Sequence, residues 1–104
     1  MAVCSGSMHR RDVSALIDIL ADKAKNHPGI RKCLMDFREA QVNLGIMGEY
    51  MIGEQAANRL AGLRIAIVHG RGQVDKLLED TAFNRGLRIL MAESLPVALE
   101  WLEA

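Results

Sequence analysis

The stretch RKCLMDFREAQVN, residues 31–43, decides the fold of this chain. Its first half, from Cys33 to Phe37, is a short run of mainly apolar residues, which is typical of a buried β-strand. Arg38 and Glu39 follow at once and predict a polar loop at the carboxyl end of that strand. In open α/β sheets, ligand sites are usually built at this end of the strands. This loop is therefore the first place where a functional site is expected.

Strand-like and helix-like segments alternate along the chain. The predicted strands are 2–5, 32–37, 64–69 and 87–91, and the predicted helices are 13–24, 46–60, 74–82 and 95–102. Helices between successive strands require right-handed crossovers and a largely parallel sheet. The sequence therefore predicts a single α/β domain over residues 1–104, a right-handed βα superhelix with a mostly parallel four-stranded sheet and about four helices.

The second predicted helix carries three glycines, Gly45, Gly48 and Gly53. An interior glycine costs a helix about 1 kcal/mol relative to alanine. We therefore expect this helix to be short, to start late or to be mobile. Met47 and Met51 on it could form an adaptable surface for apolar partners or ligands, or they could fill the core.

Charge and cysteine content exclude several classes of protein. The 13 basic and 13 acidic residues balance to a net charge of zero, so no overall field attracts nucleic acid or anionic lipid. Cys4 and Cys33 are the only cysteines and form no CxxC motif, so we expect no disulfide framework and a cytoplasmic location. No apolar run approaches the roughly 20 residues needed to cross a bilayer.

Motifs for catalysis and for cofactors are weak. Gly70-Arg71-Gly72 lies between a strand and a helix, but it lacks the third glycine or the G-K-[ST] ending of nucleotide-binding loops, so a tight turn is favoured over an anion site. The three histidines lie in separate turns, and no nucleophile motif is present, so no metal, cofactor or catalytic residue is predicted. An enzyme would require His69 to pair with Asp36, which is predicted at the same edge of the sheet.

Several segments, in order along nearly the whole chain, carry a resemblance to a known family. They are SG at 5–6 before DV at 12–13, LMDFREA at 34–40, RIAIV at 64–68 and ALEWL at 98–102. Together they resemble the STAS-like, or SpoIIAA-like, family of small bacterial proteins. The resemblance implies a right-handed βα superhelix related to anti-sigma-factor antagonists and to the lipid-carrying CRAL-TRIO fold. It implies no established enzymatic activity.

The chain departs from that family at two places. Regulatory antagonists carry an Asp-Ser-Ser-Gly-Leu phosphorylation loop where this chain has LGIMG, residues 44–48, which contains no hydroxyl group. A partner switch driven by phosphorylation is therefore not expected, and Ile46 and Met47 favour an apolar contact. Relatives usually have one more strand before the segment matching 3–5, and its absence would expose a sheet edge. Either the chain pairs with a second copy, or its natural start lies upstream of Met1.

These observations favour a non-enzymatic regulatory or protein-interaction module. The alternative is a carrier of a small apolar ligand such as a lipid or fatty acid. The expected partner is another protein or a second copy in a homodimer, with no nucleic acid and no membrane-spanning segment. The residues expected at the interaction or ligand loop are Asp36, Arg38, Glu39, Ile46, Met47, Met51 and His69.

Overall fold

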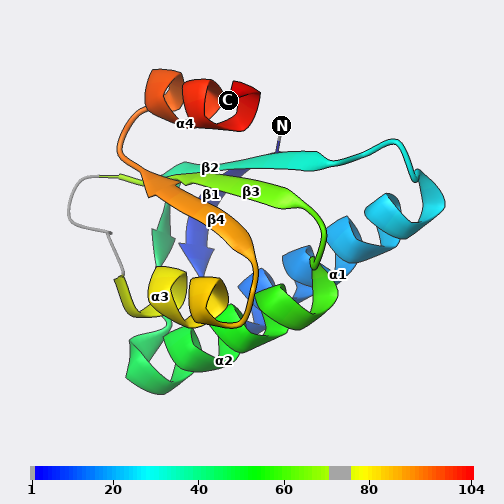
Figure 1. The fold of residues 1–104 in the computed structure, drawn as a ribbon. Helices are drawn as coiled ribbons and strands as arrows, with labels where there is room; N and C mark the ends of the chain where they lie inside the picture. The colour runs from blue at the N-terminus through cyan, green and yellow to red at the C-terminus, as the bar shows by residue number, and fades with distance from the viewer. Residues whose placement is uncertain (1, 71–75) are drawn as a thin grey trace.

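A computed structural model describes residues 2–70 and 76–104 of the chain (Figure 1). Within these ranges, strands and helices alternate as predicted. In chain order they are β1 (Ala2–Met8), α1 (Arg10–Asn26), β2 (Lys32–Val42), α2 (Gly45–Arg59), β3 (Arg64–Val68), α3 (Lys76–Asn84), β4 (Arg88–Ala92) and α4 (Leu95–Glu103). The strands form one parallel sheet in the order β1-β2-β3-β4, so the predicted α/β fold is confirmed.

Helices cover both faces of the sheet. α1, α2 and α3 lie on one face, and α4 lies on the other, over β2, β3 and β4 (Figure 1). The sequence of β3, RIAIV, explains this arrangement, because Ile65 and Ile67 enter the core beneath α1–α3 while Ala66 and Val68 enter the core beneath α4. A strand buried on both faces is an almost continuous apolar run.

Arg64, the first residue of β3, ties α4 to the sheet. Its Nη1 and Nη2 atoms donate hydrogen bonds to the carbonyl oxygens of Ala104 and Trp101, at 2.6 and 2.7 Å. Its guanidinium also lies over the Trp101 ring, 4.4 Å from the ring centroid. The last carbonyls of a helix have no partner within the helix, so a cation there both satisfies them and complements the helix dipole.

β2 is longer than predicted. The polar loop expected after Phe37 is wrong, because β2 continues to Val42 and its second half pairs with Ser5 to Met8 of β1. From the Val3–Asp36 pair to the Ser5–Glu39 pair, the register advances two residues on β1 and three on β2. This extra residue is a β-bulge. Arg38 and Glu39 resemble loop residues because they are exposed on this part of the strand.

The bulge keeps apolar residues of β2 on the face beneath α1–α3. Met35 and Phe37 point into that core, and after the bulge Ala40 does so as well, which breaks the strict alternation of a regular strand. The sequence alone shows this only as an irregular apolar pattern. An irregular pattern of this kind is easily taken for the end of a strand.

The second helix also differs from its prediction. α2 runs over 15 residues, Gly45–Arg59, so the expectation that its glycines would shorten or delay it is wrong. A β-carbon at Gly53 would lie 3.0 Å from both the Leu78 carbonyl oxygen and the Thr81 β-carbon. Glycine therefore permits a close approach of α2 to α3, and the packing compensates for the low helix propensity.

We predict that Gly53→Ala lowers the free energy of unfolding by about 1–3 kcal/mol, because the added methyl group overpacks the contact between α2 and α3. Urea unfolding followed by circular dichroism measures the change. Gly29→Ala is the matched control, since a β-carbon there would meet no atom within 4 Å. Equal stability of the two variants would show that α2 and α3 do not need a glycine at position 53 for their close packing.

Among the described residues, no helix is long and apolar enough to cross a membrane. The third helix was predicted to begin at Val74, and that residue lies outside the described ranges. The same holds for Arg71 and Gly72 of the predicted glycine turn.

Candidate functional site

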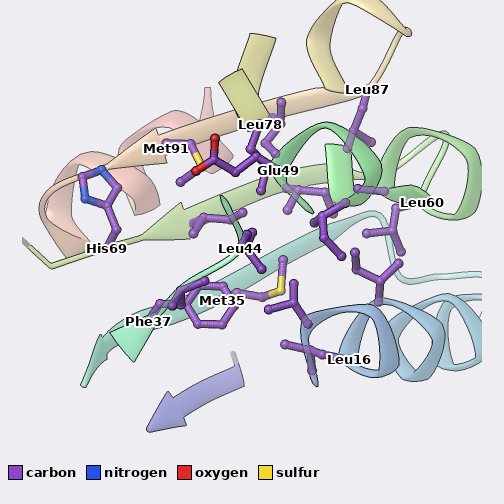
Figure 2. A pocket seen from close by; sticks show the side chains of 18 residues that line it. Leu16, Met35, Phe37, Leu44, Glu49, Leu60, His69, Leu78, Leu87 and Met91 are labelled. Carbon is purple, nitrogen blue, oxygen red and sulfur yellow. The ribbon is translucent and has the colours of Figure 1, made fainter. Parts of the chain in front are cut away.

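An apolar cavity of about 90 Å³ lies between the sheet and the helices α1–α3 (Figure 2). Its walls come from β2, β3 and β4 on one side and from α1, α2 and α3 on the other. The lining residues are Val13, Leu16, Ile17, Met35, Phe37, Val42, Leu44, Glu49, Ile52, Ala56, Leu60, Ile65, Ile67, His69, Leu78, Leu87, Ile89 and Met91. Apart from Glu49 and His69, every one of them is apolar.

Small residues on α2 explain why space remains above the sheet. The buried face of this helix includes Gly48, Gly53, Ala56 and Ala57, and only Ile52 is a large side chain among its buried residues. Glycine and alanine bring α2 close to its neighbours but leave part of the interior unfilled. A water molecule takes up about 30 Å³, so the cavity has room for about three groups of that size.

The two polar lining residues lie at one end of the cavity. Glu49 belongs to the second turn of α2, and His69 directly follows β3. Figure 2 shows the Glu49 carboxyl group beside Met91 of β4, turned toward the end of the cavity where His69 lies. This is the carboxyl edge of the parallel sheet, where ligands of α/β proteins usually bind.

His69 is held firmly in this position. Its side chain is almost completely buried, with 3% of the residue exposed, and its Nδ1 atom lies 3.0 Å from the Gly70 carbonyl oxygen. Glu49 is half-buried, and within the described residues its carboxylate makes no hydrogen bond or ion pair. The cavity thus combines an apolar interior with a small polar end.

The Asp36–Arg38 pair lies on the opposite face of the sheet. Asp36 is buried and is the register partner of Val68, whose side chain enters the core beneath α4. Its carboxylate accepts hydrogen bonds from the backbone nitrogen of Arg38 at 3.0 Å and from Nε and Nη2 of that side chain, the shortest at 2.7 Å. These contacts bridge the β-bulge, so this pair has a structural role.

Asp36 and His69 therefore do not form the pair that an enzyme at this edge of the sheet would require. Successive residues of a strand point to opposite faces, and the bulge does not alter this because it follows Asp36. The Asp36 carboxylate is bound by Arg38, whereas the His69 side chain lines the cavity on the other side of the sheet. An enzyme built on these two residues has no support in the structure.

The structure distributes the seven predicted site residues over separate places. His69 lines the cavity, Asp36 and Arg38 pair on the other face, and Glu39 is exposed on β2. The remaining predicted residues lie on α2 with exposed side chains, namely Ile46, Met47 and Met51.

The exposed residues at the start of α2 form a patch, which we call the α2 patch: Ile46, Met47, Tyr50 and Met51. Ile46 and Met47 are 77% and 69% exposed, which is unusual for large apolar side chains. Arg10 of α1 contacts one side of the patch, where its Nη1 atom lies 3.2 Å from the Met51 sulfur.

Glu49 is not among the site residues predicted from the sequence. A signal for it exists, because Glu49 stands three residues before Ile52 and seven before Ala56, which is the spacing of one helix face. A carboxylate on the buried face of a predicted helix indicates either a buried ion pair or a ligand site.

Comparisons of the chain with known protein families, with characterised proteins and with solved structures found no match.

We predict that the Asp36–Arg38 pair makes the stability of the fold sensitive to acid. Hydrogen bonds from the Arg38 side chain, and then from its backbone, lower the pKa of Asp36 below its usual value. A lowered pKa in the folded state stabilises the protein above the unfolded-state pKa, near 4, and this contribution is lost as the pH falls further through the lowered pKa.

Asp36→Asn should therefore be less stable than the wild type at about pH 7, and the difference should shrink at about pH 3. Urea midpoints at both pH values measure the effect. Asp80→Asn, at an exposed position on α3, is the control and should change neither midpoint appreciably. A deficit of Asp36→Asn that is as large at low pH as at neutral pH would refute the electrostatic explanation.

Proposed function

We propose that this chain binds a small apolar molecule, or the end of a longer apolar chain, in the cavity between the sheet and α1–α3. The single observation that carries the proposal is an apolar cavity whose polar groups, Glu49 and His69, gather at the carboxyl edge of a parallel sheet. Ligand sites typically combine an apolar lining with a few polar groups that orient the ligand.

The energetic cost of an empty cavity supports this proposal. In core substitutions the loss of stability rises by about 24 cal/mol per Å³ of enclosed cavity, so about 2 kcal/mol is an upper bound on the cost of this partly open volume of about 90 Å³. That is a substantial part of the stability of a small domain. A bound apolar group would recover much of this lost stability.

The resemblance to the STAS-like family agrees with this function. We propose membership of that family on the segments that resemble it, and its kinship with lipid-carrying folds favours an apolar ligand. In this proposal the chain is a carrier and catalyses no reaction. The cavity is too small for a whole lipid, so a long ligand would insert only one end.

Xenon is a suitable probe, because it binds dry apolar cavities and fits a small volume. We predict that xenon shifts the methyl resonances of Ile52, Ile67 and Leu78, which line the cavity. Val42→Phe should weaken this binding at least about tenfold, because the larger ring occupies the cavity. Methyl-selective NMR titration under xenon pressure measures both effects.

Val97→Phe is the matched control, since it makes the same substitution at an exposed position on α4, on the other face of the sheet. Equal xenon binding by the wild type and by both variants, or no shift of the cavity methyl groups in the wild type, would overturn the proposal. Native mass spectrometry of freshly purified protein then gives the mass of any molecule carried from the cell.

We propose protein contact through the α2 patch as a second function. The observation that favours it is the exposure of Ile46 and Met47, which lie where the related antagonists carry their phosphorylation loop. A contact here would bury an apolar surface of the partner and would need no phosphate. The outer edge of β1, which pairs only with β2 among the described strands, supports a second copy as a further partner.

Ile46→Asp should abolish capture of a protein partner from cell extract, because a buried carboxylate would replace an apolar contact. Affinity capture followed by mass spectrometry measures this. Ile19→Asp, the same change at an exposed isoleucine of α1, should leave capture intact. The α2 patch would be rejected if both variants captured the same partners as the wild type.

A further inference from the structure

We propose that the ligand of the cavity carries a hydrogen-bond-donating head group, a primary hydroxyl or an amine, rather than a carboxylate. This inference rests on the proposed function and deepens it by naming the ligand class. It follows from the hydrogen-bonding capacity of the two polar residues that line the cavity, His69 and Glu49.

The first of these atoms is Nε2 of His69. The Nδ1 atom of the same ring lies 3.0 Å from the Gly70 carbonyl oxygen, and a carbonyl oxygen can only accept a hydrogen bond. Nδ1 must therefore carry the proton. In the neutral imidazole the other nitrogen, Nε2, is then an acceptor.

The second polar group is the Glu49 carboxylate. An ionised carboxylate only accepts hydrogen bonds, and within the described residues no donor reaches it. Figure 2 shows it at the same end of the cavity as His69. Nε2 of His69 and the Glu49 carboxylate are thus both acceptors, and an acceptor that is removed from water without gaining a donor is costly.

A ligand with a donor head would satisfy these acceptors, while its apolar tail would fill the cavity. A fatty-acid carboxylate, the example suggested by the sequence, would instead place a second negative charge and further acceptors beside Glu49. Specificity of this kind comes as much from the repulsion of the wrong ligand as from attraction of the right one. The polar end therefore selects donors and rejects anions.

A pair of isomers tests this directly. Butan-1-ol and methyl propyl ether have the same atoms and similar apolar surface, but only the alcohol can donate a hydrogen bond. Hydrogen bonds to charged groups contribute about 1.5–3 kcal/mol, so the alcohol should bind at least about tenfold more tightly. NMR titration of the cavity methyl groups in the intact wild-type protein measures both affinities. Butylamine should also bind, and butanoate should not.

Glu49→Gln supplies a donor at the same place and should reduce the preference for the alcohol to about threefold or less. Glu100→Gln, at an exposed position on α4, should keep the wild-type preference. Equal affinity for alcohol and ether in the wild type, tighter binding of butanoate than of butan-1-ol, or an unchanged preference in Glu49→Gln would overturn the inference.

If xenon binds but the protein does not prefer the alcohol over the ether, the head-group inference fails and the cavity proposal stands. If xenon, alcohol and ether all fail to bind, both are overturned.

Discussion

The burial of β3 on both of its faces is the constraint on which the rest of this structure depends. Ile65 and Ile67 require cover on one side, and Ala66 and Val68 require cover on the other. Because β3 has a parallel neighbour on each edge, its connections to them must be crossovers, which here are helices. Because both of its faces are apolar, helices lie on both sides of the sheet. α4 closes one layer with the help of Arg64, and α1–α3 close the other. The cavity lies in the second layer, directly on the side chains of this strand.

The same close packing that holds α2 in place creates the space beneath it. Gly53 lets α2 approach α3, and Ala56 and Ala57 continue the face of small residues toward the sheet. Small side chains permit short distances between backbones but do not fill the volume between a helix and a sheet. Protein interiors are usually close-packed, so this apolar volume departs from ordinary packing, and the proposed ligand site rests on that departure.

β2 connects the two sides of the molecule through its bulge. Asp36 and Arg38 stabilise the extra residue on the α4 side of the sheet, and the change of alternation keeps Phe37 and Ala40 in the opposite core. The charged residues that first suggested a site therefore support the strand that carries part of the cavity wall. Their contribution to function is indirect, through the position of Phe37.

The alternation of strands and helices, the parallel sheet and the cover on both faces follow from local patterns, and the sequence by itself determined them. Periods of two and of 3.6 residues, together with glycine breaks, are properties of neighbouring residues. The full length of β2, the integrity of α2 and the separation of Asp36 from His69 depend on contacts between distant segments. Only the tertiary structure decided them. The candidate site belongs to this second group, since Glu49 of α2 and His69 after β3 line the same cavity only once α1–α3 have packed against the sheet. No short-range pattern contains that information.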